Sequence, residues 1–257
     1  MGSVLLVVDI GNTNAVFGVY EGEKIKSSFR VASDKTKTSD ELGILFGQLL
    51  EYKNIERSDI KACIISSVVP PMTPNVEEMI NDYFGLEPII VGPGVKTGLN
   101  IKYENPKEVG ADRIVNAVAA LNLYGGPLIV VDFGTATTFC AISEKWEYLG
   151  GVVCPGVGIS AEALFERASK LPRVEIIRTE KIIGKNTVSS MQAGLYYGYV
   201  GQVDGIVRRM QQELGWEAKV VATGGLAKLL GEGSETVNII NPTLTLDGLR
   251  LIYELNQ

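Results

Sequence analysis

Three aspartates stand where this sequence could act on a charged substrate: Asp9, Asp112 and Asp132. Asp9 ends the apolar run of "LLVVDIGNTN", and Asp132 ends a near copy of it, "LIVVDFGTAT". A strand that runs into Asp-x-Gly and then Thr or Asn places backbone N–H groups and hydroxyls around a tight turn. Because glycine has no Cβ, such a turn can admit phosphate oxygens closely. The repeated pattern predicts two phosphate-binding turns.

A carboxylate beside a phosphate repels it unless a cation lies between them or the carboxyl group takes a proton. Two such turns therefore predict a nucleoside triphosphate with a metal ion, held from both sides. A single Asp-x-Gly-x-Thr is also compatible with an ordinary β-hairpin and an Asx-turn. The second copy, together with "TGGLAKL" after a late apolar run, favours phosphate binding.

The chain contains no histidine. This excludes the commonest general base, the commonest transition-metal ligand and every Ser-His-Asp arrangement. Proton transfer must therefore fall to a carboxylate, lysine, tyrosine or cysteine, and zinc chemistry is disfavoured.

Composition excludes several classes of partner. A net charge of -6 and a pI near 5.0 lack the basic excess of a nucleic-acid surface. No apolar run approaches the ~20 residues that span a bilayer, and the N-terminus has a strand pattern instead of a signal peptide. Cys63, Cys140 and Cys154 each lie in an apolar run and are expected to be small buried hydrophobic residues in a reducing compartment. We expect a cytoplasmic protein of 257 residues without a nucleic-acid or membrane partner.

The elements that must position the first turn follow one another as strand, turn, strand, strand, helix, strand, helix. Ser39 is the expected N-cap of the first helix, and Gly85 is expected to end the second. The apolar patterns predict strands at 5–8, 15–20, 25–31 and within 61–72, and helices within 36–52 and 73–85.

The second half repeats this order after a predicted helix at 111–124. Strands are expected at 128–131, 138–142, 148–153 and within 218–230, and helices at 159–170 and 189–215, with an irregular segment at 172–185 between them. Small residues in the predicted helix at 189–215 would let another helix approach closely: Ala193, Gly194, Gly198 and Gly201. The repeat predicts an α/β protein built by tandem duplication of one unit, with both acidic turns facing a cleft.

Six segments taken together resemble the type III pantothenate kinase family, a branch of the acetate and sugar kinase, Hsp70 and actin superfamily. They are "DIGNTN", "SSVVPP", "GPGVKTGLNIKYENPKEVGADR", "DFGTATT", "GGVVCPG" and "TGGLAKLL". The resemblance covers essentially the whole chain. It implies two duplicated actin-like (ribonuclease H-like) domains, 1–113 and 114–257, with the last helix able to pack back on the first domain and the active site in the cleft. The implied reaction is ATP-dependent phosphorylation of pantothenate to 4'-phosphopantothenate, the first step of coenzyme A biosynthesis.

The resemblance also implies how ATP is held. Asp132 resembles the family's ligand for a monovalent cation, K⁺ or NH₄⁺, and Thr135 its ATP-contacting hydroxyl, while Mg²⁺ is expected to enter with ATP. The segment 223–229 would lie towards the adenosine. The first turn resembles the phosphate loop of the family, formed by Asp9, Ile10, Gly11, Asn12, Thr13, Asn14, Ala15 and Val16.

For pantothenate, Asp112 in "VGADR" resembles the family's general base, and Gly110, Ala111 and Arg113 would hold the substrate. An arginine fork suits the carboxylate that pantothenate carries. Tyr103 resembles a further substrate contact, and Thr187 one that the neighbouring subunit of a homodimer donates. "GGVVCPG", at 150–156, resembles the family's interface motif.

Each of these motifs alone has an ordinary structural interpretation. "GADR" is compatible with an acidic first turn of a helix, Tyr103 with a packing tyrosine, Thr187 with a helix N-cap and 150–156 with a turn. Two other functions are also weighed: a kinase for a sugar or a short acid, and a non-catalytic regulator that binds nucleotide. The first would need insertions for which this chain has no room, and the second would not need a base such as Asp112. A polymerising or chaperone-like protein is the least favoured.

Overall fold

The computed structural model describes residues 4–257, and the chain divides into two compact units. Unit 1 comprises the described residues up to Gly98 together with Asn105–Ala119 and Thr245–Gln257, and unit 2 comprises Leu99–Glu104 and Ala120–Leu244. The last helical segment therefore belongs to unit 1 although it follows unit 2 in the chain. The division at 113/114 stays a prediction, and each unit is described by itself.

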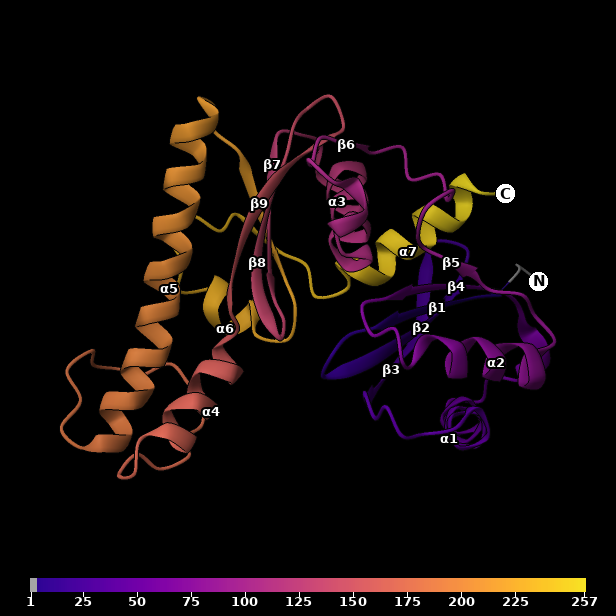
Figure 1. Cartoon of the computed structure of the whole chain (residues 1–257), viewed down its shortest axis with the longest axis horizontal. Helices are drawn as coiled ribbons and strands as arrows, with labels where there is room; N and C mark the ends of the chain where they lie inside the picture. The colour runs from indigo at the N-terminus through magenta and orange to yellow at the C-terminus, as the bar shows by residue number, and fades with distance from the viewer. Residues whose placement is uncertain (1–3) are drawn as a thin grey trace. The chain divides into compact units, whose positions relative to one another are not determined.

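Unit 1 contains a five-stranded sheet in the order β3-β2-β1-β4-β5 (Figure 1). Strands β1 to β3 form an antiparallel meander, whereas β4 pairs parallel with β1, and β5 parallel with β4. The strands are β1 Val4–Ile10, β2 Asn14–Glu21, β3 Lys24–Ala32, β4 Ile60–Ser67 and β5 Ile89–Ile90.

Helices α1 (Ser39–Tyr52) and α2 (Thr73–Phe84) cover one face of this sheet (Figure 1). Alternate residues of β1 and β4 enter the core that these helices close, because side chains of a strand point to opposite faces in turn. The cap of α1 is Thr38 and not Ser39, because Thr38 and Glu41 form a reciprocal capping box. Gly85 ends α2 in the left-handed conformation, as predicted.

Unit 1 also takes in the start of helix α3 (Ala111–Tyr124), which crosses into unit 2 at Ala120, and helix α7 (Leu244–Leu255). Helix α7 lies close to α3, since a Cβ on Gly248 would stand 2.2 Å from the carbonyl oxygen of Val115. Tyr20 of β2 donates a hydrogen bond to Asp247 of α7 at 2.7 Å, which ties α7 to the sheet. Short 3₁₀ turns occupy Arg57–Asp59 and Pro106–Glu108.

Unit 2 contains a six-stranded sheet in the order β11-β10-β7-β8-β9-β6 (Figure 1). Strands β7 to β9 form an antiparallel meander, β10 pairs parallel with β7, and β11 parallel with β10. The strands are β6 Asn100–Ile101, β7 Leu128–Phe133, β8 Ala136–Ile142, β9 Glu147–Pro155, β10 Lys219–Thr223 and β11 Ile239–Ile240.

One face of the second sheet packs against helices α4 (Val157–Arg167), α5 (Thr187–Leu214) and α6 (Ala227–Gly231). The segment 168–186 between α4 and α5 has no regular helix or strand, as predicted for 172–185. Helix α5 is the longest helix in the described part of the chain, and it closes the core with buried residues on one side.

The predicted duplication is confirmed by the strand orders. The series β3-β2-β1-β4-β5 and β9-β8-β7-β10-β11 have the same sequence of antiparallel and parallel pairings, and β6 is an addition at the edge of the second sheet. Equivalent strands therefore place Asp9 and Asp132 at equivalent points, the carboxyl ends of β1 and β7. Among residues 4–257, no helix is long and apolar enough to cross a membrane.

Candidate functional site

Asp9 lies at the end of β1, partly buried, between two neighbouring strands. Its ladder partners are Val16 of β2 and Ser66 of β4. Val8 and Ile10, on either side of Asp9, point into the core beneath α1 and α2. The carboxylate therefore lies on the opposite face of the sheet.

The turn after Asp9 is held by backbone and side-chain hydrogen bonds. The N–H of Gly11 donates to the carbonyl of Asn14 at 3.1 Å. The chain that leaves β3 braces it, because the Ser33 hydroxyl donates to the Gly11 carbonyl at 2.5 Å and the Ser33 N–H to the Thr13 carbonyl at 3.0 Å. Asn12 and Thr13 are exposed, which leaves the tip of this turn open to a ligand.

Ser66 is a residue at this turn to which sequence reasoning gave no role. It is fully buried on the same face as Asp9, and its hydroxyl has no hydrogen-bond partner among the described residues. A buried hydroxyl without a partner costs free energy, and such positions are enriched at functional sites. The motif "SSVVPP" was the available signal, since it places a serine at the carboxyl end of the strand next to Asp9.

Asp112 lies in the first turn of α3. Its Oδ1 accepts a hydrogen bond from the Arg113 N–H at 2.7 Å, and a Cβ on Gly110 would stand 2.5 Å from the same oxygen. A side chain at position 110 would therefore displace this carboxylate.

The chain next to Asp112 is connected to the first turn. A Cβ on Gly110 would also lie 3.6 Å from Val68, and the Val68 N–H donates to the Ile10 carbonyl at 3.0 Å. The structure therefore brings the loop after β4, the start of α3 and the turn after Asp9 together within unit 1.

The environment of Asp112 suits proton transfer. Burial raises the pKa of this carboxyl above its ordinary value, and the Arg113 N–H and guanidinium offset only part of that rise. A carboxylate with a raised pKa is a better proton acceptor at neutral pH than an exposed aspartate. Asp112 therefore fits both expectations from the sequence: it is the acidic residue in the first turn of α3, and it has the environment expected of a base.

Asp132 at the end of β7 has Thr138 and Thr223 as its ladder partners. The following turn is short: the Gly134 N–H donates to the Ala136 carbonyl at 3.1 Å, and Thr135 is exposed. The tip of this turn, Gly134 and Thr135, is exposed, as a phosphate contact requires.

The backbone at two glycines from elsewhere in unit 2 lies very close to this turn. A Cβ on Gly156 would stand 2.2 Å from the Thr135 carbonyl oxygen, and a Cβ on Gly224 would stand 2.4 Å from Asp132 Oδ1. Gly224 also has a φ of +94°, which side chains rarely adopt. The turn after Asp132, with Gly156 and Gly224 packed against it, is called the cradle below. This packing is possible only because residues 156 and 224 lack a side chain.

The donor atoms of this cradle fit a monovalent cation. The carboxylate of Asp132 and the carbonyl groups of the adjoining turn are oxygen donors, which replace the hydration shell of ions such as K⁺. In the described part of the chain, no cluster of three or more histidine, cysteine, aspartate or glutamate side chains could hold a metal ion.

Tyr103 and Thr187 lie in unit 2. The Tyr103 ring packs edge-on against Tyr148 with ring centroids 6.3 Å apart, and Gly150 of "GGVVCPG" adjoins the same ring. Thr187 is exposed at the start of α5, but Asn186 is the N-cap, with its side chain accepting from the Ser189 N–H at 2.9 Å. The N-cap interpretation of Thr187 is wrong, whereas the packing role of Tyr103 is confirmed.

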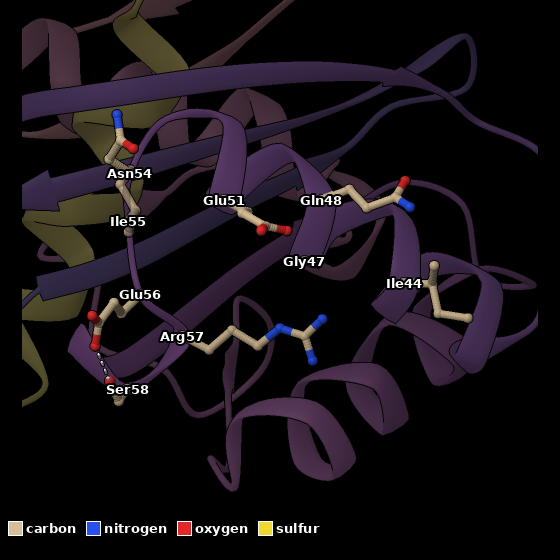
Figure 2. Close-up of a pocket in the computed structure, with 9 residues that line it drawn as sticks. All are labelled: Ile44, Gly47, Gln48, Glu51, Asn54, Ile55, Glu56, Arg57 and Ser58. Carbon is tan, nitrogen blue, oxygen red and sulfur yellow. Dashed lines mark hydrogen bonds between the residues drawn. The ribbon is translucent and has the colours of Figure 1, made fainter.

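A pocket of about 710 Å³ lies away from these residues, along α1 and the segment after it (Figure 2). Arg57 crosses this region with its guanidinium over the Tyr83 ring, and the acids Glu51 and Glu56 line the same pocket. None of the predicted site residues lines it. The mixture of one cation and two acids disfavours a phosphate ligand there.

Comparison with known proteins gives a family. A model of the family described as type III pantothenate kinase matches residues 5–209 of this chain.

Three solved structures share the fold at low sequence identity. One, named as a Baf family transcriptional activator from Campylobacter jejuni, is 21% identical, with 98% of each chain covered and a TM-score of 0.61. The ethanolamine utilization protein EutJ from Carboxydothermus hydrogenoformans is 16% identical, with 96% of this chain and 89% of that chain covered and a TM-score of 0.54. An inorganic polyphosphate/ATP-glucomannokinase from Arthrobacter sp. strain KM is 12% identical, with 100% of each chain covered and a TM-score of 0.51. At these identities the likeness shows the fold alone, and it confirms the duplicated actin-like architecture.

Proposed function

Since this chain belongs to the type III pantothenate kinase family, it is a phosphotransferase that acts on pantothenate, and we propose which of its residues carry out the transfer from ATP. The product would be 4'-phosphopantothenate, which commits pantothenate to coenzyme A. The observation that carries the proposal is the partly buried carboxylate of Asp112 beside the first phosphate turn.

Asp112 is the general base in this proposal. It accepts the proton of the pantothenate primary hydroxyl as that oxygen attacks the γ-phosphoryl group. Phosphoryl transfer passes through a loose transition state, so the base mainly orients the nucleophile. The raised pKa of Asp112 supports this role, because the carboxyl group then binds the transferred proton more readily.

The ATP phosphates are held in this proposal by residues 9–16 and by the hydroxyl of Thr135. The exposed tip at Asn12 and Thr13 supports this assignment. Bound Mg²⁺ would neutralise charge that develops on the phosphates, and Asp9 would hold it together with the phosphate oxygens. A site made of one carboxylate and the substrate is typical of Mg²⁺ in kinases.

A monovalent cation, K⁺ or NH₄⁺, is proposed at Asp132. The turn after Asp132 supports this, because Asp132 Oδ1 and the Ala136 carbonyl oxygen lie 3.6 and 3.5 Å from where a Cβ on Gly134 would stand. A cation there would screen the negative charge of Asp132 from the triphosphate.

Pantothenate is proposed to lie against Gly110, Ala111, Arg113 and Tyr103. The lack of a Cβ at Gly110 supports close approach of a ligand to the Asp112 carboxylate. The Arg113 fork would pair with the substrate carboxylate in two parallel hydrogen bonds.

A homodimer is proposed to complete the pantothenate site with Thr187 of the second copy. An apolar surface supports it: Ile182 is 65% exposed and Ile183 is 73% exposed, close to Thr187 in the chain. Gly194, Gly198 and Gly201 on α5 have open space where a Cβ would stand, so a second helix could approach there. The exposed apolar residues of this region are Val153, Ile159, Leu164, Phe165, Ile177, Ile182, Ile183 and Val188.

The cytoplasm is the proposed location. None of the three cysteines forms a disulfide, and the two buried ones, Cys63 and Cys140, act as small apolar side chains, which is typical of a reducing compartment.

The test is ATP-dependent phosphorylation of pantothenate by the purified protein with Mg²⁺, first in potassium and then in sodium buffer. Product in potassium or ammonium alone supports both the kinase and the Asp132 cation site. Product in both buffers keeps the kinase and contradicts the cation assignment. No product in either buffer, with ATP still bound, contradicts the kinase and favours a nucleotide-binding regulator.

The shared site is tested with Thr187→Ala. We expect an increased KM for pantothenate with little change in the KM for ATP. Mixing this variant with Asp112→Asn should partly restore the wild-type KM, because mixed dimers contain one intact site. Absence of any restoration in mixed dimers would contradict a site shared between subunits.

A further inference from the structure

The segment 224–238 leaves strand β10 and returns to the same strand. It begins at Gly224, which presses against Asp132, and it ends where the Asn238 N–H donates to the Val220 carbonyl at 3.0 Å and the Asn238 side chain accepts from the Val220 N–H at 2.7 Å. The Asn238 end of this excursion is thus held to β10 by two hydrogen bonds. The position of the rest of the segment depends on the contacts that its middle residues make.

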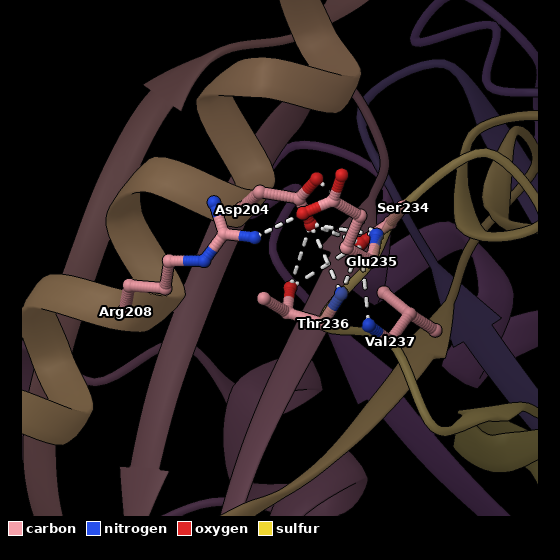
Figure 3. A network of polar contacts seen from close by, with 6 residues as sticks. All are labelled: Asp204, Arg208, Ser234, Glu235, Thr236 and Val237. Atoms are coloured by element: carbon pink, nitrogen blue, oxygen red, sulfur yellow. Dashed lines mark hydrogen bonds and ion pairs between the residues drawn. The ribbon is translucent and has the colours of Figure 1, made fainter.

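Asp204 of α5 holds the middle of the excursion (Figure 3). Its Oδ1 accepts from the Ser234 hydroxyl at 2.6 Å, from the Thr236 hydroxyl at 2.9 Å and from the Thr236 N–H at 3.1 Å. The Glu235 N–H donates to both carboxylate oxygens, at 3.1 and 3.2 Å. One carboxylate therefore satisfies two backbone and two hydroxyl donors of three consecutive residues.

The carboxylate is ionised in this environment. Burial alone would raise the pKa of Asp204, but the hydrogen bonds from Ser234, Glu235 and Thr236 outweigh it and hold the pKa below its ordinary value. The side chain is nearly inaccessible, with 6% of its surface exposed. At its rim Arg208 forms an exposed ion pair with Glu235.

The rest of the excursion packs closely against α5 and the core of unit 2. A Cβ on Gly233 would stand 2.2 Å from the Tyr196 hydroxyl, so the backbone here lies directly on α5. Ala227 and Leu230 of α6 are buried in the core of unit 2. The Ala227 N–H donates to the Gly224 carbonyl at 3.2 Å, which joins α6 to the glycine that touches Asp132.

We propose that Asp204 is a positioning residue for nucleotide binding, which acts by fixing the 224–238 excursion so that Gly224 stays against the Asp132 turn. This rests on the proposed function, in which that turn contacts ATP through Thr135 and holds a monovalent cation at Asp132. Asp204 touches neither ATP nor pantothenate in this account. Its effect is on the shape of the nucleotide side of the site and not on the base.

The test is Asp204→Asn, measured by titration with Mg-ATP in the absence of pantothenate and by steady-state kinetics. The amide keeps the shape of the carboxylate, but its NH₂ group would face donors, and the charge is lost. We expect the Kd and the KM for ATP to rise about tenfold, while the KM for pantothenate and kcat at saturating ATP stay within twofold of wild type.

Arg208→Gln is the matched control, because it removes only the exposed ion pair with Glu235 on the same helix and loop. Its ATP affinity should stay within twofold of wild type. Should Asp204→Asn not fold, Ser234→Ala keeps the carboxylate and removes one donor, and we expect a smaller rise of about threefold in the KM for ATP.

The outcomes separate this inference from the proposed function. Unchanged ATP affinity in folded Asp204→Asn, or an equal rise in the KM for ATP and the KM for pantothenate, overturns the positioning role of Asp204. In that case the proposed kinase function still holds if the wild-type protein forms product. A wild-type protein that binds ATP without phosphorylating pantothenate overturns the proposed function alone, and the ATP titration still decides the role of Asp204. Failure of wild-type protein to bind ATP overturns both.

Discussion

The two acidic turns occupy equivalent points of duplicated sheets, but different groups hold them in place. At the first turn, Ser33 follows β3 and its N–H donates to the Thr13 carbonyl. At the second, Gly156 follows β9 in the same register, and its N–H donates to the Thr135 carbonyl. The first turn has a side chain where the second has none.

On the other side of each turn, serine in the first unit again corresponds to glycine in the second. Ser67 follows the pair Asp9–Ser66, and its hydroxyl accepts from Thr73 at 2.7 Å. Gly224 follows the equivalent pair formed by Asp132 and its partner on β10. The Ser33 hydroxyl therefore braces the first turn, and the Ser67 hydroxyl ties the end of β4 to the start of α2. At the second turn, glycine at both equivalent positions lets backbone lie directly against the turn.

This difference shows what duplication preserves and what it leaves free. The strand order and the placement of the acid are kept. The bracing changes with the ligand that we propose for each turn: phosphates with Mg²⁺ at the first, and a cation in a narrow cradle at the second. The following predictions test that division, from the largest expected effect to the smallest.

The largest difference in activity is expected between variants of the two acids, Asp9 and Asp132. Asp9→Asn should lower kcat by about 10²–10³-fold, because it removes the proposed carboxylate beside Mg²⁺ and the phosphates. Asp132→Asn should retain more activity but lose stimulation by potassium. Rates measured in potassium and in sodium buffers distinguish the two. An Asp132→Asn protein still stimulated by potassium would show that the cation binds elsewhere.

A side chain at Gly156 should disrupt the second turn. Gly156→Ser places a Cβ 2.2 Å from the Thr135 carbonyl oxygen, and we expect a loss of about 1–3 kcal/mol in the free energy of unfolding, with weaker ATP binding. Gly158→Ser is the control, because a Cβ at Gly158 meets no atom within 4 Å. Denaturant unfolding and ATP titration measure both. Equal stability of the two variants would contradict the close packing of this turn.

Asp112→Asn should stabilise the fold while it removes activity. The raised pKa means that the folded state binds this proton more tightly than the unfolded state, so ionisation above the folded pKa costs stability. Asparagine does not titrate and keeps the acceptor for the Arg113 N–H. We expect a higher Tm than wild type at pH 7 and a smaller difference near pH 4. A lower Tm at pH 7 would contradict the unfavourable burial of this carboxylate.

The smallest effect is expected at Ser33. Ser33→Ala removes one hydrogen bond to the Gly11 carbonyl and should cost about 0.5 kcal/mol of stability. The KM for ATP should rise about twofold, since the backbone hydrogen bond from residue 33 to Thr13 remains. A loss as large as that of Gly156→Ser would remove the distinction between the two turns.

Sequence patterns predicted most of this fold because the signals are local. Alternation and apolar runs place the long strands, and proline and glycine mark both ends of α2. The N-cap of α1 was displaced by one residue, since the Thr38 and Glu41 capping box outweighs Ser39. The strands β5, β6 and β11, each of two residues, were not predicted, because their pairing depends on neighbours distant in sequence.

The site was predictable where a turn motif carries the chemistry and not where packing does. Asp9 and Asp132 follow from a repeated motif, and the role of Asp112 from a resemblance. The unpartnered hydroxyl of Ser66 and the clamp at Asp204 have no local pattern. They become visible only when strands and loops far apart in the chain are brought together.

The role of Asp112 as general base is tested most directly by the turnover of Asp112→Asn with pantothenate and ATP, measured beside its ATP affinity. We expect ATP binding within twofold of wild type and a kcat lower by about 10²–10⁴-fold, because the proton acceptor is removed and the phosphate turns are intact. A kcat within about tenfold of wild type would contradict Asp112 as the general base.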